Sequence, residues 1–197
     1  MKKKTLALVL ALMLVVVGVV SGTLAWLTAQ SDTVVNTFTT SDIKVELKET
    51  KGTGTGNNRE FKMVPGYTID KDPTATVLTG SEECFLFVKL VKSNTFDTYL
   101  EYTPADGWTQ LTKDKDGKDI TDLIYYRKVL SADINTAYSV LKNNQVTVKG
   151  DVTKAQMDAL NAQGAVKPTL TITAYASQLH KNADVDFSAA EAWANIK

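Results

Sequence analysis

One long apolar run near the N-terminus separates the chain into two parts of different character. Residues 6–20 read LALVLALMLVVVGVV without a charge, and three lysines at positions 2–4 precede them. Mostly small residues fill positions 21–25, after which the chain becomes polar and rich in β-branched residues. A basic start, an apolar run and a small-residue exit are the three parts of a secretory signal peptide. We therefore expect a hydrophobic signal helix over residues 1–25 and one exported domain over residues 26–197.

The exit from the apolar run predicts a signal-peptidase cleavage site between Ala25 and Trp26. Thr23 and Ala25 then stand third and first before the cut, the places that favour small residues. If the run is read on to Leu27, it reaches about 20 residues, which is enough for an uncleaved membrane anchor. The small-residue exit favours cleavage. In both cases the lysines stay inside and the body leaves the cytoplasm, so we expect a secreted or cell-surface protein that meets the membrane only through its leader.

After the leader, alternating apolar and polar residues predict about eight short strands. In the clearest of them, residues 169–177, the side chains of Leu170, Ile172, Ala174 and Ala176 share one face. Residues 85–91, FLFVKLV, are almost continuously apolar, which is typical of a strand buried on both faces. The other expected strands are residues 33–38, 43–47, 74–79, 146–148 and a hairpin of 107–111 with 123–130, while 94–102 fits a short helix or an edge strand.

Two short helices are predicted from capping boxes, in which the residue before the helix and the third helical residue satisfy each other's backbone N–H groups. Thr153 and Gln156 begin the first helix, and Gly164 is expected to end it. Its expected apolar stripe is Ala155, Ala159 and Leu160. The second helix begins at Ser188 and is expected to bury Ala189, Ala192, Trp193 and Ile196. Short strands with two short helices indicate a mainly β, antiparallel sandwich.

Composition adds little specific chemistry to this picture. The chain carries 22 basic and 22 acidic residues, a balance that gives no electrostatic footprint for nucleic acid. Cys84 is the single cysteine, so an intrachain disulfide is impossible. Its apolar neighbours favour a small buried hydrophobe over a reactive thiol. An exported domain without disulfides has to be stabilised by packing, by ions or by assembly.

The residues that could carry catalysis or bind a metal are few. His180 is the only histidine, so the HExxH pattern of zinc proteases is missing, and we expect it to lie in a surface loop. Asp114, Asp116 and Asp119 surround Gly117, and an oxygen-rich loop of this kind suits Ca²⁺. The glycine is fourth rather than sixth in the loop and lysines separate the carboxylates, which favours a solvated hairpin tip. We therefore expect no cofactor and no catalytic residues.

Two stretches resemble the TasA/camelysin family of exported Gram-positive proteins. Residues 22–26, GTLAW, together with Asn36-Thr37-Phe38 are similar to the family's Gly-Thr-x-Ala exit, aromatic residue and N-T-F-like strand. Residues 64–71, VPGYTIDK, are similar to its P-G-x-x-x-x-K segment. The resemblance implies processing by a signal peptidase of the SipW type, a jelly-roll sandwich and a structural role in biofilm-matrix fibres. Because camelysins are described as metallopeptidases, an exported peptidase is the alternative, and a membrane-tethered binding module of the cell surface is the third.

The segment after the predicted cleavage site has the pattern of a strand that can pair with another copy of the chain. Residues 26–39, WLTAQSDTVVNTFT, contain no proline or glycine and one charge, at Asp32. Val34, Asn36 and Phe38 alternate with the residues between them, as on one face of a strand. A terminal strand can enter the sheet edge of a neighbour, and this contact repeated head to tail builds a filament. It can equally complete its own sandwich as an edge strand.

Overall fold

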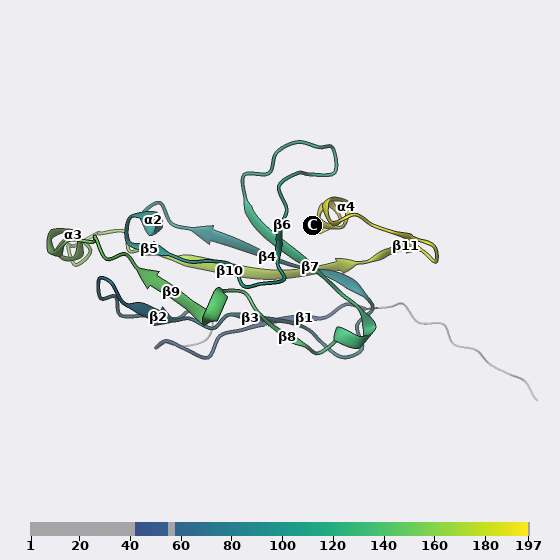
Figure 1. Cartoon of the computed structure of the whole chain (residues 1–197), viewed down its shortest axis with the longest axis horizontal. Helices are drawn as coiled ribbons and strands as arrows, with labels where there is room; N and C mark the ends of the chain where they lie inside the picture. The colour runs from purple at the N-terminus through teal and green to yellow at the C-terminus, as the bar shows by residue number, and fades with distance from the viewer. Residues whose placement is uncertain (1–41, 55–57, 197) are drawn as a thin grey trace, which may run out of the picture. The chain divides into compact units, whose positions relative to one another are not determined.

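The computed structural model describes residues 42–54 and 58–196, and it is mainly β, as expected (Figure 1). Every strand pairing in it is antiparallel. The predictions of a signal helix, of cleavage between Ala25 and Trp26, and of a pairing strand with Val34, Asn36 and Phe38 concern residues outside this range. Among the residues described, no helix has the length and apolar character needed to cross a bilayer.

One layer is a four-stranded sheet in the order β10-β4-β7-β6. Its strands are β4 (Cys84–Lys92), β6 (Thr109–Gln110), β7 (Leu123–Val129) and β10 (Leu170–Gln178). β10 lies against β4 along its whole length, from Leu170 opposite Lys92 to Gln178 opposite Cys84. The predicted hairpin of 107–111 with 123–130 is confirmed, since Thr109 pairs with Tyr126.

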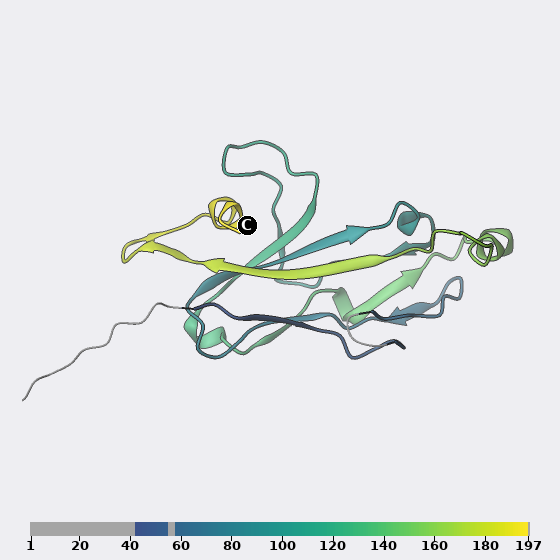
Figure 2. The same ribbon diagram turned by 180° about the vertical axis from the view of Figure 1, so that it is seen from behind.

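The facing layer consists of two three-stranded sheets that follow one another lengthwise (Figures 1 and 2). The first has the order β1-β3-β8, with β1 (Val45–Lys48), β3 (Thr74–Val77) and β8 (Ala137–Ser139). The second has the order β2-β9-β5, with β2 (Thr68–Asp70), β9 (Gln145–Val148) and β5 (Leu100–Glu101). β2 and β8 were not predicted, because three residues are too few to show a period of two.

Short elements complete the described part of the chain. They are the helices α2 (Phe96–Tyr99), α3 (Lys154–Ala159) and α4 (Ala189–Ala194), the 3₁₀ turns η1 (Ser131–Asp133) and η2 (Lys142–Asn144), and the hairpin of β11 (His180–Asn182) with β12 (Val185–Asp186). Residues 94–102, which fit a helix or a strand, contain both, because α2 leads directly into β5. Pro65 and Gly66 form a turn closed by the Tyr67 N–H, which donates to the Val64 carbonyl at 3.0 Å, with Gly66 at a φ of 79° that favours glycine.

Two apolar cores lie on opposite faces of β4. Cys84, Leu86, Val88 and Leu90 point into the larger core between the layers, and Phe85 and Phe87 point into a smaller core beneath α4. The prediction that this strand is buried on both faces is confirmed for residues 85–88 and Leu90, whereas Lys89 is half-buried and Val91 is exposed. Burial of each large apolar side chain contributes about 1.5–3 kcal/mol, so β4 stabilises both cores at once.

The capping boxes are present in both predicted helices, but the two helices differ in how well their packing was predicted. Thr153 with Gln156 and Ser188 with Glu191 make the reciprocal hydrogen bonds. In α4, Ala189 and Ala192 are buried, and Trp193 and Ile196 pack beside them, as expected. In α3, the predicted stripe is right only at Leu160, which is buried in the larger core; Ala155 and Ala159 are exposed, and Met157, which was not predicted, packs against that core. Gly164 does not end this helix, because α3 stops at Ala159 and Gly164 lies in a later turn.

Candidate functional site: a cleft between two open sheet edges

Two of the edge strands in the described part of the sandwich, β10 and β1, have their open edges on the same side of the larger core. β10 pairs with β4 on one side, and no described strand pairs with its other side. β1 likewise pairs only with β3. β1 belongs to one layer and β10 to the other, and the two strands lie beside each other. The larger core is therefore bounded along this side by two strands, each of which pairs on one edge only among the described residues.

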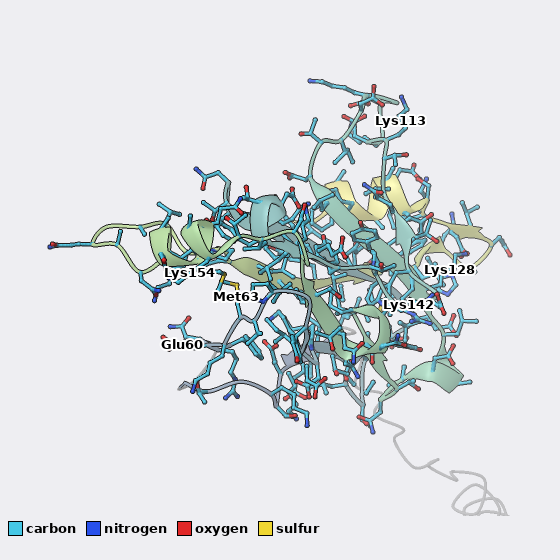
Figure 3. All side chains as sticks on the ribbon, turned by 60° about the vertical axis from the view of Figure 1, so that its left-hand side comes forward. Glu60, Met63, Lys113, Lys128, Lys142 and Lys154 are labelled. Atoms are coloured by element: carbon cyan, nitrogen blue, oxygen red, sulfur yellow. The ribbon has the colours of Figure 1, made fainter. Side chains whose placement is uncertain are left out.

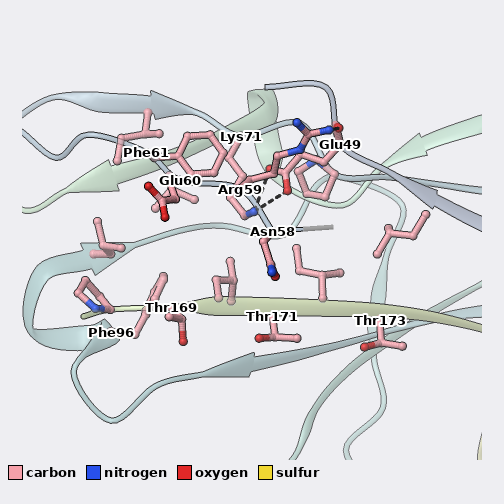
Figure 4. Close-up of a pocket in the computed structure, with 18 of the residues that line it drawn as sticks. Glu49, Asn58, Arg59, Glu60, Phe61, Lys71, Phe96, Thr169, Thr171 and Thr173 are labelled. Carbon is pink, nitrogen blue, oxygen red and sulfur yellow. Dashed lines mark hydrogen bonds and ion pairs between the residues drawn. The ribbon is translucent and has the colours of Figure 1, made fainter. Parts of the chain in front are cut away.

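A cleft of about 1150 Å³ opens between these edges (Figure 4). Leu170, Ile172 and Ala174 form its wall on β10, and Val45 and Leu47 form its wall on β1. The floor is made by apolar side chains from five further segments: Met63, Ile69, Phe96, Leu100 and Val146. These lining residues also pack in the larger core, so the cleft is an extension of that core to the surface.

The alternating sequence of β10 explains why this wall is apolar. Even-numbered residues from Leu170 to Ala174 face the core, as predicted, while Thr171 and Thr173 border the cleft with exposed side chains that point away from this apolar wall (Figure 4). An open strand edge offers backbone N–H and C=O groups, and the apolar side chains beside it form pockets for alternate residues of an extended partner. The cleft therefore has the chemistry of an acceptor for a β-strand.

An ion pair lines the cleft where β1 ends. Lys71 Nζ donates to both carboxylate oxygens of Glu49, at 2.8 and 2.9 Å, and the two side chains are only 12% and 17% exposed. The ammonium also lies 5.2 Å from the centre of the Phe61 ring. Arg59 donates to the backbone carbonyl of Glu49 at 3.0 Å. Because the Lys71 ammonium and the Glu49 carboxylate are shielded from water, each needs hydrogen-bond partners within the protein. The two groups provide these partners for each other.

Asp72 fixes the chain that leaves β1. Its carboxylate accepts the backbone N–H groups of Thr50 and Lys51, both at 2.9 Å, and the hydroxyl of Thr50 at 2.5 Å. Burial acts to raise the pKa of Asp72, but these hydrogen bonds to the charged form outweigh it, so the pKa is lowered. The ionised carboxylate thereby holds the segment after β1 in place beside the cleft.

The acidic loop predicted as a weak calcium site lies elsewhere, in the β6–β7 connection. Figure 3 shows Lys113 at the outer part of this loop, away from both layers. Asp119 pairs with Lys113 at 2.6 Å and Asp116 with Lys115 at 2.9 Å, while Asp114 accepts backbone N–H groups of the loop. In residues 42–54 and 58–196, no three acidic, histidine or cysteine side chains are grouped to hold a metal ion. Asp116 and Asp119 thus each pair with a lysine, and Asp114 stabilises the turn through backbone hydrogen bonds, so the three carboxylates do not converge on one point.

His180 was predicted in a surface loop, and the structure corrects this: it opens strand β11. Its ring is exposed and stands between two carboxylates, with Nδ1 2.7 Å from Asp186 and Nε2 3.0 Å from Glu83. Hydrogen bonds to Glu83 and Asp186 raise the pKa of His180. Glu83 also accepts the backbone N–H and hydroxyl of Ser131, and these bonds, with that of His180, lower its pKa to about 2.

Cys84 behaves as the sequence predicts. Its side chain is fully buried in the larger core, and burial raises the pKa of the thiol to about 11. The thiolate is therefore suppressed near neutral pH. His180 lies on the exposed hairpin, whereas Cys84 faces the larger core.

The cleft itself was not predicted from the sequence. The alternation of Leu170, Ile172 and Ala174 predicted a strand with one apolar face, but not that its edge stays open. Comparison with known proteins adds no further evidence, since no family model, curated protein or solved structure matches this chain.

Proposed function

We propose that this chain is a secreted structural protein that assembles into fibres by adding its N-terminal strand to a neighbouring copy. The observation that carries the proposal is the cleft between β1 and β10, where an open edge and an apolar wall coincide. Its occupant is the segment that contains Val34, Asn36 and Phe38. This segment belongs to the leader-proximal region, which the resemblance to TasA-like matrix proteins also covers.

The dimensions of segment and cleft agree. Residues 34–38 would span about 16 Å as a strand, at about 3.3 Å per residue, and the five residues from Leu170 to Ala174 cover the same length. The apolar wall runs from Leu170 to Ala174, and its three inward side chains follow the same period of two as Val34, Asn36 and Phe38. Backbone hydrogen bonds to β10 would supply affinity, and the apolar lining would bury Val34 and Phe38.

Such a contact produces a filament because the two surfaces differ. One copy presents its N-terminal segment and the next presents its cleft, so the interface is heterologous and does not close on itself. Export supplies the timing: while the leader of residues 1–25 is attached, the segment is held at the membrane, and a signal peptidase of the SipW type would release it. In this proposal the two facing layers are those of a jelly roll, and the partner is a homopolymer rather than nucleic acid or substrate.

The test begins with the mature chain, residues 26–197, and with a form that lacks residues 26–38. We expect the mature chain to form filaments visible by electron microscopy. The shortened form should stay a folded monomer and bind a synthetic peptide of residues 26–38. A truncated protein that unfolds outright, or that forms filaments as readily as the mature chain, would contradict strand addition.

A matched pair of substitutions on β10 localises the effect to the cleft. Ile172→Lys places a charge on the apolar wall, whereas Thr173→Lys places the same charge on the exposed face of the next residue. We expect the first to abolish peptide binding and filaments and the second to preserve both, with both variants folded by circular dichroism. If both variants lost peptide binding and filament formation to the same extent, net charge rather than the cleft would control assembly.

A further inference from the structure

Neither strand of the β11–β12 hairpin buries a side chain. The hairpin leaves the end of β10 and leads into α4 (Figure 1). Every residue of its two strands is exposed, and its register is irregular between His180 and Asn182. A two-stranded hairpin without a buried face is marginally stable on its own. Its position therefore depends on the few polar links that join it to neighbouring elements.

His180 is the residue at which these links meet. Its Nδ1 lies 2.7 Å from Asp186, the cross-strand partner on β12, and its Nε2 lies 3.0 Å from Glu83, the residue before β4. Glu83 also accepts the backbone N–H and the hydroxyl of Ser131, at 2.9 and 2.8 Å, which fixes it to η1. One imidazole ring thus connects the two strands of the hairpin to each other and to the sandwich.

The charged groups around His180 come from several elements. They are Glu83, Asp186 on β12, Lys128 on β7, and Lys181, which donates to Glu191 on α4 at 2.5 Å. Asp186 also accepts from Lys128 at 3.0 Å, so this carboxylate keeps a cation whether or not the ring is protonated. Within residues 42–54 and 58–196, no lysine or arginine lies within ion-pair distance of Glu83. A neutral ring therefore leaves Glu83 without a cation.

The two contacts of the ring require it to carry two protons. Hydrogen bonds, chiefly from Ser131 and Lys128, lower the pKa of Glu83 and of Asp186, so both carboxylates are ionised near neutral pH and only accept. A neutral imidazole has one N–H, and its other nitrogen would turn a lone pair toward a carboxylate oxygen. Loss of a proton therefore removes one link. We expect the longer link, to Glu83, to be lost, because Asp186 belongs to the hairpin itself.

We infer that the hairpin is a proton-operated clamp: it is docked on the sandwich while His180 is doubly protonated, and it detaches from Glu83 when one proton leaves. This device goes beyond the proposed function, because His180 lies outside the cleft. Hydrogen bonds to Glu83 and to Asp186 raise the pKa of His180. The clamp is therefore closed below the ordinary value of 6.5 and opens as pH rises through the higher folded-state pKa.

The first measurement is an NMR titration of His180 in the mature chain, where it is the only histidine. We expect the ring to titrate above its ordinary pKa in the wild type, and closer to that value in Glu83→Gln, which removes one of the two carboxylates. A wild-type ring that titrates at or below the ordinary value would overturn the inference, because the two carboxylates would then not hold the second proton.

A nitroxide spin label at the tip of the hairpin reports whether the clamp opens. Ala183→Cys places the label between the two strands, and Thr173→Cys, at an exposed position of β10, is the matched control. The native thiol does not compete for the label, because Cys84 is fully buried and its pKa is raised to about 11. Electron paramagnetic resonance spectra are recorded from pH about 5.5 to about 9, which covers the raised pKa of His180.

We expect the mobile fraction of the label at Ala183 to rise at least about twofold, with its midpoint at the pKa that NMR gives for His180, while the label at Thr173 changes little. His180→Gln, which donates from one nitrogen only, should leave the hairpin mobile at every pH. His180→Arg, which keeps its charge, should remove the pH dependence. A flat wild-type profile, a rise that persists in either variant, or an immobile label in His180→Gln would overturn the clamp.

Discussion

Replacement of Lys71 by methionine should destabilise the fold by about 3 kcal/mol, even though the new side chain is of similar length. The Lys71 ammonium lies 2.8 Å from the Glu49 carboxylate. At an effective dielectric constant of about 20, this distance gives an attraction of about 6 kcal/mol, which desolvation of both groups partly offsets. Loss of one partner from a buried pair costs about 3–5 kcal/mol. We expect a destabilisation at the lower end of this range, because the Glu49 side chain is still 17% exposed to solvent.

The assay is urea unfolding of the mature chain at pH 7, for Lys71→Met, Glu49→Gln and the double variant. Lys48→Met is the matched control, because Lys48 pairs with Glu46 at the same 2.8 Å but with side chains 69% and 37% exposed. The control should change the free energy of unfolding by less than about 0.5 kcal/mol. The double variant should recover part of the loss, because it leaves no unpaired charge. If Lys71→Met costs no more than the control, burial does not govern the strength of this pair.

Three further predictions concern other parts of the chain. Phe87→Ala should cost about 3–5 kcal/mol in urea unfolding because Phe87 is fully buried beneath α4, whereas Val91→Ala, at a 49% exposed side chain, should cost less than about 0.5 kcal/mol. The hydrogen bonds to Glu83 and Asp186 raise the pKa of His180, so their stabilisation is complete below its ordinary value of 6.5 and is lost as pH rises through the higher folded-state pKa. Unfolding measured from pH about 5.5 to 8.5 should show this loss in the wild type and not in His180→Gln. Ala25→Phe should leave a membrane-retained precursor, and a normal mature N-terminus found by mass spectrometry would contradict the predicted cleavage site.

Strands with a long, strong pattern could be predicted from the sequence. β4 and β10 each extend over nine residues, and their continuous or alternating apolar patterns follow directly from burial on two faces or on one. The capping boxes of α3 and α4 were also predicted, because their hydrogen bonds join residues three apart. The stripe of α3 was predicted correctly only at Leu160, because a helix of six residues is positioned by a few contacts, here those of Met157 and Leu160, and not by its own periodicity.

The cleft depends on interactions that a local pattern does not contain. Glu49 and Lys71 are 22 residues apart, and the walls of the cleft on β1 and β10 come from opposite ends of the domain. A strand edge stays open only if no other strand pairs with it. Because the strands of one sheet come from distant parts of the chain, a local sequence pattern does not predict which edge stays open. The residues of the cleft were visible in the sequence as apolar positions, but their common surface required the fold.

The two faces of β10 have an optical consequence. Ala174 lines the cleft, and the next residue, Tyr175, lies on the opposite face of the sheet, where its ring is 5.4 Å from that of Trp193 on α4. The centre of the Phe87 ring lies 5.2 Å from the centre of the same indole ring. A small shift of β10 on strand entry would therefore alter the packing around Trp193. Its fluorescence should report the state of the cleft from the far side of the sheet, without a dye, once Trp26 and Trp108 are replaced by phenylalanine.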